Sequence, residues 1–313
     1  MSIENKINKY SDIVISKCGI NDQDILVIRD DIYPFIGGGS KARKAVAYEK
    51  FLKENGYNAI VTCGGIQSNH NRAMALMCAR NAWKCHLCIQ GDAERFYAEK
   101  GNALLDRLSG AVCEIIKPED TAMAMDKAME NLRQEGYNPY YVIGGGHNLP
   151  GGTCFVDAVI ELKKQCDVIR YKPDYIFLAS GTGSTQAGIV VGLDLVGWND
   201  VKCIGISVAR QKERGTQVIA EFANMLANHY GIEKDYSEEI LFNTDYLCGG
   251  YEKYTPEMDE FLLNATKQTG LMFDTTYSGK ALYGMVDMIK KNPLMQGKNI
   301  IFWHTGGLMN IMK

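Results

Sequence analysis

Two lysines beside a glycine-rich segment could carry chemistry. The stretch "PFIGGGSKARKA" covers residues 34–45 and places Lys41 directly after three glycines and Ser40, with Lys44 three residues later. A lysine in a glycine-lined, partly desolvated pocket can lose its proton and attack a carbonyl carbon, forming a Schiff base. If a helix starts here, Lys44 lies on the same side as Lys41. The alternative is a loop followed by a solvated, basic helix start.

A second glycine-rich stretch, "SGTGSTQAG" at residues 180–188, is suited to binding a phosphate. It follows a predicted strand and opens a predicted helix, so backbone amides point outward, and Ser184 and Thr185 add hydroxyl donors. Its glycine spacing does not fit the dinucleotide fingerprint, and "GGGSKA" lacks the Ser or Thr of a Walker A loop. A small cofactor with a phosphate and an aldehyde, such as pyridoxal phosphate, fits both stretches. A tight turn with capping hydroxyls is the alternative.

A third loop, "GGIQSNHNR" at residues 64–72, adds Ser68, Asn69 and His70 between a predicted strand and a predicted helix. Ser and Asn are common helix caps, so capping is one interpretation of these residues. In the functional interpretation, Asn69 bonds the cofactor ring and Ser68 lies at the substrate. His70 is either an acid–base group or a core or capping histidine.

Alternating strand and helix patterns must position these loops. Residues 59–65 and 175–180 are apolar, β-branched runs typical of buried strands, and the stretches after their loops have helical spacing. Further predicted strands are "KCHLCIQG", "AVCEII", "YYVIGGG", "VKCIGISVA" and "KNIIFWHTGG", and one helix is predicted from Ala93 to Gly110. Successive βα units predict parallel sheets with helices on their faces. Two such domains with a cleft between them place ligands at the strand ends.

Composition excludes some classes of protein. A net charge of −3 argues against non-specific nucleic-acid binding as the main function. We see no secretory signal and no apolar run long enough to span a membrane, so we expect a cytoplasmic protein with reduced cysteines. Cys85 and Cys88 form a lone CxxC in a predicted buried strand, without the partners of a zinc site, so no metal is predicted.

The ordered motifs resemble one family of enzymes. "GGGSKARKA", "GGIQSNHNRA", "GTGSTQAG", "DTTYSGKALYGM" and "HTGG" together resemble the D-cysteine desulfhydrase and 1-aminocyclopropane-1-carboxylate deaminase family, from about residue 29 to residue 307. The resemblance implies a pyridoxal phosphate enzyme of fold type II, related to tryptophan synthase β and expected to be a homodimer. We expect an α/β fold of two open twisted parallel-sheet domains with helices on both faces. Residues 1–44 plus 156–313 would form the large cofactor-binding domain, and residues 45–155 a small domain inserted in it.

The resemblance also implies roles for individual residues. Lys41 matches the Schiff-base lysine, Lys44 a second lysine near the phosphate, and Asn69 the partner of the ring oxygen. Ser68 matches a serine used in proton transfer or nucleophilic attack, with His70 beside it at the substrate. The phosphate loop and the active-site tyrosines match the following positions: Gly181, Thr182, Gly183, Ser184, Thr185, Tyr251 and Tyr277.

One position separates the two activities of the family. At this position the deaminases of the family have a sequence similar to "VYEGK", whose glutamate can keep the pyridine nitrogen of the cofactor protonated. The desulfhydrases have a sequence similar to "VYTGK", with a hydroxyl residue instead. This chain has Ser278 there. A neutral hydroxyl there would leave the pyridine nitrogen unprotonated, a weaker electron sink that disfavours cyclopropane opening more than β-elimination. The chain departs from the family at Ser40, in "IGGGHNLPGG" and at Tyr254, positions that we expect to border the substrate pocket.

These observations predict a lyase that carries out α,β-elimination on a small amino acid with a polar β-substituent. D-cysteine is the leading substrate, giving pyruvate, ammonia and the leaving group, and cysteate and serine-like compounds come next. A β-replacement synthase that traps the aminoacrylate with a second nucleophile is the first alternative. A 1-aminocyclopropane-1-carboxylate deaminase, a nicotinamide enzyme and a non-catalytic binding protein are the others. No nucleic-acid or membrane partner is expected.

Overall fold

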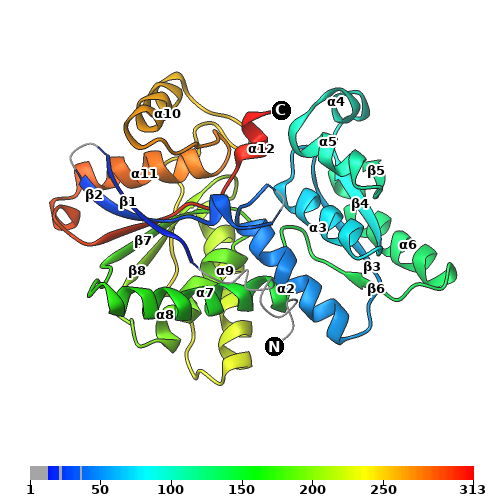
Figure 1. Ribbon diagram of the computed structural model, residues 1–313, viewed down its shortest axis with the longest axis horizontal. Helices are drawn as coiled ribbons and strands as arrows, with labels where there is room; N and C mark the ends of the chain where they lie inside the picture. The colour runs from blue at the N-terminus through cyan, green and yellow to red at the C-terminus, as the bar shows by residue number, and fades with distance from the viewer. Residues whose placement is uncertain (1–12, 21–22, 36) are drawn as a thin grey trace.

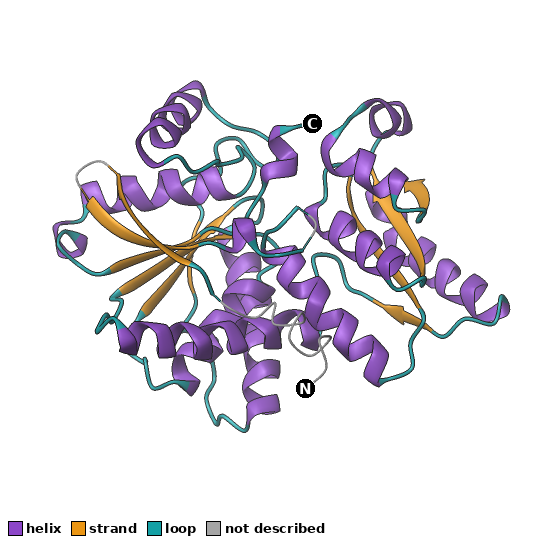
Figure 2. Ribbon diagram, in the orientation of Figure 1, coloured by secondary structure: helices purple, strands orange, loops and turns teal. Residues whose placement is uncertain are grey.

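The computed structural model describes residues 13–20, 23–35 and 37–313, which fold around two β-sheets. Figure 1 shows the larger sheet on the left and the smaller on the right, with helix α2 (Ser40–Glu54) between them. Figure 2 shows helices packed around both sheets. The larger sheet takes its strands from both ends of the chain, and the smaller sheet takes its strands from the segment between.

The larger sheet has the strand order β1-β2-β10-β7-β8-β9. Its strands are β1 (Ile15–Ile20), β2 (Gln23–Ile28), β10 (Ile300–Trp303), β7 (Tyr175–Ser180), β8 (Lys202–Ser207) and β9 (Leu241–Asn243). All neighbours pair in parallel except β1, which is antiparallel to β2. All six residues of β7 are buried, as expected of a central parallel strand covered on both faces.

The smaller sheet is entirely parallel, with the order β5-β4-β3-β6. Its strands are β5 (Val112–Ile116), β4 (Lys84–Gln90), β3 (Ala59–Gly65) and β6 (Pro139–Tyr141). Both β3 and β7 end in a loop that leads into a helix, so the second and third sequence motifs lie at the carboxyl ends of parallel strands. This is the edge of an open α/β sheet at which ligands bind.

The helices form apolar layers on these sheets. Their bounds are α3 (Asn69–Arg80), α4 (Ala93–Ala98), α5 (Gly101–Leu108), α6 (Thr121–Gln134), α7 (Leu149–Val168), α8 (Ser184–Leu195), α9 (Lys212–Tyr230), α10 (Pro256–Thr269), α11 (Ser278–Lys291) and α12 (Leu308–Ile311), with short 3-10 turns η1 (Asp30–Ile32), η2 (Pro118–Asp120) and η3 (Pro293–Met295). Residues of α10 and α11 form one apolar cluster with the larger sheet, and residues of α7 and α8 form another. In the smaller sheet, α6 lies on one face and α2 and α3 on the other.

Some predicted elements were wrong in extent. The single helix predicted from Ala93 to Gly110 is two helices, because Glu99 is extended and Gly101 has a positive φ of 58°. The strand predicted through "YYVIGGG" ends at Tyr141, and the chain then turns through Gly145 and Gly146, both with positive φ. The sequence analysis missed the β1–β2 pair, α9 and β9.

The two sheets agree with the predicted pair of α/β domains. The predicted boundaries, 44/45 and 155/156, fall inside α2 and α7, so both helices contribute residues on either side of them. These exact boundaries remain a prediction. Among the described residues, no helix combines the length and the apolar character needed to cross a membrane.

Candidate active site

Lys41 and Lys44 lie one turn apart on α2 and share one acceptor. Lys41 Nζ donates to the carbonyl oxygen of Gly145 at 2.8 Å, and Lys44 Nζ donates to the same oxygen at 3.0 Å. The helix begins at Ser40, so the two lysines lie on the same side as the functional interpretation required, and Lys44 is buried rather than solvated. The preceding turn needs glycine at Gly38, whose φ is 56° and where a Cβ would lie 2.0 Å from the carbonyl oxygen of Asp31.

A buried ion pair fixes the start of this helix. Arg43 donates from Nε and Nη2 to the carboxylate of Asp30, and Trp303 Nε1 donates to the same carboxylate at 2.9 Å. All three side chains are buried. Because Arg43 lies between the two lysines in the sequence and on a different side of the helix, its bond to Asp30 helps to fix the rotation of α2 and so the direction of both lysines.

The loop after β7 faces the two lysines. Gly183 caps α8 with a φ of 95°, and a Cβ there would lie 2.5 Å from Ile219. Ser184, at the first position of α8, accepts a hydrogen bond from Lys44 Nζ at 2.6 Å. The helix start therefore presents free amide donors and a lysine ammonium at the same place, an arrangement suited to an anion.

The pKa values of both lysines are shifted by burial. Burial lowers the pKa of Lys41 to about 8. Burial, followed by the nearby charge of Lys41, lowers the pKa of Lys44 well below its usual value. In the described part of the chain neither lysine has a carboxylate within ion-pair distance, and the contact of Arg210 is with the carbonyl oxygen of Gly181. Three basic side chains without acidic partners make the site electropositive.

A cavity of about 730 Å³ opens beside these groups. The following predicted site residues line it: Lys41, Ser68, Asn69, His70, Gly181, Thr182, Gly183, Thr185, Tyr251 and Tyr277. Lys44, Ser184 and Ser278 are fully buried and do not belong to the lining. The structure thus brings the loops of both sheets around one cavity.

The start of α3 supplies the polar wall on the side of the smaller sheet. Ser68 caps α3 and accepts from the amide of Asn71 at 3.1 Å, so the capping interpretation is correct and Ser68 also lines the cavity. The side-chain oxygen of Asn69 accepts from Arg72 at 3.0 Å and from Asn102 at 3.0 Å. These bonds fix the orientation of the Asn69 amide, whose NH₂ group can still donate.

His70 is neutral. Its Nε2 lies 2.8 Å from the hydroxyl of Thr62, and its buried Nδ1 has no hydrogen-bond partner. Burial lowers the pKa of His70 well below its usual value, and the charges of Lys41 and Lys44 act in the same direction. Because the Thr62 hydroxyl donates to the carbonyl oxygen of Val142, Nε2 of the neutral ring donates to Thr62, and Nδ1 is left as an acceptor for a hydrogen bond.

Two tyrosines form the wall on the side of the larger sheet. The hydroxyl oxygens of Tyr251 and Tyr277 are 2.5 Å apart, and the rings meet edge to face. Although 40% of Tyr251 is exposed, its hydroxyl faces Tyr277, and burial raises the pKa of Tyr251 to about 12. Burial also raises the pKa of Tyr277 well above its usual value. Both phenols keep their protons at neutral pH and can donate them.

Ser278 has a defined partner. Its hydroxyl donates to Asp274 Oδ1 at 2.7 Å, and its backbone amide donates to the same oxygen at 2.9 Å. A contact between Ser278 and the cofactor ring, which the family resemblance implies, stays a prediction.

Two residues at which the chain departs from the family lie in different places. Tyr254 is 51% exposed and lies outside the cavity lining, whereas Ser40 lies within it. Of these two sequence departures, only Ser40 borders the cavity.

Sequence reasoning missed several residues of the cavity. The most consequential is Gly145, whose carbonyl accepts from both lysines; its loop was expected to border the substrate pocket, but no role was predicted for this residue. Arg210 and Ser180 also line the cavity, and the buried Ser180 hydroxyl has no hydrogen-bond partner. Ser180 is the last residue of the strand before the loop, and this position could have identified it from the sequence as a residue of the site.

These residues fit pyridoxal phosphate. A dianionic phosphate would use the loop 181–185, Lys44 and the unpartnered Ser180 hydroxyl, and an aldehyde would meet the amine of Lys41. Residues 15–306 match the family described as "Pyridoxal-phosphate dependent enzyme". The chain belongs to this family. Its cofactor is pyridoxal 5'-phosphate, as predicted.

Relatives of this chain carry both names that the motifs suggested. The chain is 30% identical over 292 residues to a D-cysteine desulfhydrase of Klebsiella pneumoniae, an alignment covering 91% of this chain and 87% of the relative. It is 31% identical over 286 residues to a 1-aminocyclopropane-1-carboxylate deaminase of Ralstonia nicotianae, covering 87% and 82%. A solved ACC deaminase homologue superposes with a TM-score of 0.85 at 29% identity, covering 96% of this chain and 91% of that one. These matches confirm the predicted fold type II and a related enzyme of lyase type.

Proposed function

We propose that this enzyme catalyses α,β-elimination on a small amino acid with a polar β-substituent, and that D-cysteine is its best substrate. The products would be pyruvate, ammonia and sulfide, with one water consumed. The observation that carries the proposal is that Lys41, a base of lowered pKa, and a pair of protonated phenols line one cavity. Elimination needs both a base for the α-proton and an acid for the leaving group.

The cofactor, when bound, supplies the electron sink that acidifies the α-carbon. Lys41 would hold it covalently and, once released, its neutral amine would take the α-proton. Gly145 holds that amine by its carbonyl oxygen, so the amine is oriented before substrate arrives. Tyr277, oriented by Tyr251, would give a proton to the departing sulfur. Ser68 and Asn69 would position the substrate, and Lys44 and the loop 181–185 would bind the phosphate.

The hydroxyl of Ser278 supports elimination over cyclopropane opening. A serine supplies no carboxylate to the cofactor ring at this position, and its hydroxyl proton is already directed to Asp274. Ring opening of 1-aminocyclopropane-1-carboxylate lacks a good β leaving group and needs the stronger sink. We therefore infer that the deaminase activity named for one relative is weak or missing in this enzyme.

The test is a screen of the purified holoenzyme for release of pyruvate. Substrates would be both enantiomers of cysteine and serine, cysteate, and 1-aminocyclopropane-1-carboxylate, whose deamination is read as ammonia. We expect the highest kcat/KM for D-cysteine, with sulfide equal to pyruvate. Efficient ammonia release from the cyclopropane substrate alone would overturn the proposal. A thiol acceptor that replaces pyruvate by a substituted amino acid would instead establish a β-replacement synthase.

Homodimer formation and a cytoplasmic location remain predictions.

A further inference from the structure

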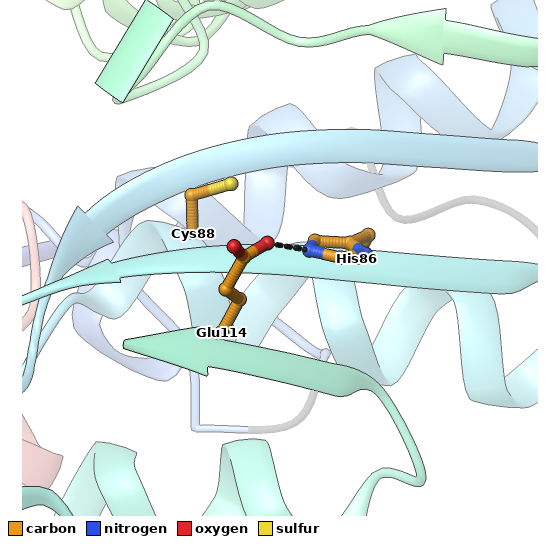
Figure 3. Close-up of side chains that lie close together, drawn as sticks. All are labelled: His86, Cys88 and Glu114. Carbon is orange, nitrogen blue, oxygen red and sulfur yellow. Dashed lines mark hydrogen bonds and ion pairs between the residues drawn. The ribbon is translucent and has the colours of Figure 1, made fainter. Parts of the chain in front are cut away.

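Three side chains that could bind a metal meet on the smaller sheet, outside the lining of the active-site cavity. They are His86 and Cys88 on β4 and Glu114 on β5, and Figure 3 shows them directed toward one another. One ligand atom of each lies within 4.8 Å of the other two. His86 Nε2 and Glu114 Oε2 are 2.8 Å apart.

The register of the strands explains this meeting. His86 and Cys88 are two residues apart on β4 and therefore share a face. Glu114 pairs directly with Cys88 across the parallel β4–β5 ladder, so its side chain rises on that face as well. The backbone of two paired strands thus fixes the three ligands, which needs less ordering than a site built on loops.

The site combines a buried ligand with an open side. Cys88 is fully buried, whereas the side chains of His86 and Glu114 are 15% and 41% exposed. β5 is an edge strand of the sheet, so Glu114 is reached from solvent. An ion can enter past Glu114 and lose most of its water at Cys88.

We propose that His86, Cys88 and Glu114 form a binding site for a divalent ion of the zinc type. Imidazole nitrogen, thiolate and carboxylate are the three ligands that zinc takes in proteins, at about 2.0–2.1, 2.3 and 2.0–2.2 Å. A thiolate disfavours magnesium and calcium, which prefer oxygen ligands. The fourth position would hold water, and the bound ion would cross-link the edge strand β5 to β4.

The proposal differs from the sequence prediction, which found no metal site around the CxxC pair. Strand geometry gives the physical reason. Cys85 and Cys88, three apart, point to opposite faces, and Cys85 packs in the apolar cluster with α2 and α3 while Cys88 faces α6. The partners of Cys88 are the histidine within the CxxC and a glutamate 26 residues later, a spacing that matches no zinc motif.

Binding must displace the thiol proton. Zinc binds a cysteine as its thiolate, so binding at Cys88 releases the thiol proton and becomes weaker as pH is lowered. This dependence is a second readout of the same site.

Equilibrium dialysis of the holoenzyme against Zn²⁺ tests the proposal, with Cys85→Ala as the matched control for Cys88→Ala. We expect one Zn²⁺ per chain in the native enzyme and in Cys85→Ala. Cys88→Ala and Glu114→Gln should each bind at least about 100-fold more weakly, the upper range for loss of even a supporting partner. Glu114→Gln keeps the side-chain shape at a partly exposed position, so it tests the site even if Cys88→Ala folds poorly.

X-ray absorption at the zinc edge gives the deciding structural signature. One sulfur at about 2.3 Å, lost in Cys88→Ala and kept in Cys85→Ala, is the expected result. Equal zinc binding by the native enzyme and by Glu114→Gln, or a spectrum with nitrogen and oxygen ligands only, would overturn the proposal. Neither result depends on which amino acid the enzyme converts.

Discussion

Two parts of the cavity lining differ in the groups that they offer to a bound molecule: one offers mainly backbone amides and the other side chains. The phosphate side, formed by the loop 181–185 and Lys44, consists largely of backbone amides at a helix start, closed behind by buried side chains. Another part of the lining, formed by the start of α3 and the Tyr251–Tyr277 pair, consists of side chains. We call these the cradle and the rim.

This difference predicts a division of labour. A phosphate bound by backbone groups depends little on any one side chain, so the cradle should govern cofactor retention. The rim directs hydroxyl and amide groups at the substrate, so its variants should change turnover. Lys41 belongs to both, because it lines the cavity and shares the carbonyl oxygen of Gly145 with Lys44. The predictions that follow separate cradle from rim.

Replacement of Lys41 should have the largest effect. Lys41→Ala removes both the covalent attachment and the base, so turnover should fall by at least the 10²–10⁴-fold that a positioned base contributes. The absorption band of covalently linked cofactor should disappear as well. Lys44→Ala is the control, and it should keep that band. The reverse pattern would exchange the roles of the two lysines.

Tyr277→Phe should be the most damaging rim variant. Loss of the buried phenol proton donor should lower kcat by about 10²-fold, the low end for general acid catalysis, without weakening cofactor binding. Tyr251→Phe, which leaves Tyr277 in place, should lower kcat less. Measurement of kcat together with the cofactor dissociation constant checks both. A Tyr277→Phe enzyme that loses cofactor but keeps its kcat would place this tyrosine in the cradle.

Lys44→Ala should weaken the cradle alone. A charge-assisted hydrogen bond contributes about 1.5–3 kcal/mol, so cofactor affinity should fall roughly 10- to 150-fold. At saturating cofactor, kcat should stay within a few-fold of the native value. Dialysis followed by absorption spectroscopy measures the affinity. An equal fall in kcat at saturating cofactor would contradict the division between cradle and rim.

The pH dependence of cofactor attachment should report on Lys41. Only the neutral amine attacks the aldehyde, and burial lowers the pKa of Lys41 to about 8. The rate of attachment to the apoenzyme should therefore rise about tenfold per unit below pH 8 and level off above it. For a lysine with an unperturbed pKa, the rate would continue to rise up to about pH 10.4. Stopped-flow absorption at several pH values distinguishes the two.

The cradle was predictable from sequence because its chemistry is local. A buried apolar strand, a glycine turn and a helix start are contiguous at residues 175–195, and each carries its own signal. The common direction of Lys41 and Lys44 could be predicted as well, because residues three apart on a helix lie on the same face.

The contacts that form and support the rim could not be predicted from local sequence patterns. Tyr251 and Tyr277 are 26 residues apart and meet only in the folded chain, and only family resemblance pointed to them. The contact of both lysines with Gly145 spans about 100 residues. The β1–β2 pair was missed because β1 is half-exposed and shows no continuous apolar run.

Asn310 provides the smallest expected effect, because it supports two parts of the rim, Asn69 and the Asp274–Tyr277 turn, without lining the cavity. It accepts from Asn102, which also bonds Asn69 of the rim, and donates to Asp274, the partner of Ser278. In Figure 1 its helix, α12, lies beside α5, between the two sheets.

Asn310→Ala should lower the free energy of unfolding by about 1–3 kcal/mol, since it leaves buried polar groups unpaired. The exposed neighbour Ile311→Ala is the control, and urea unfolding measures both. Because the bridge joins Asn69 to Asp274, KM and kcat should also change by a few-fold in Asn310→Ala. A loss of stability with unchanged kinetics would mean that the two parts of the rim keep their positions independently of α12.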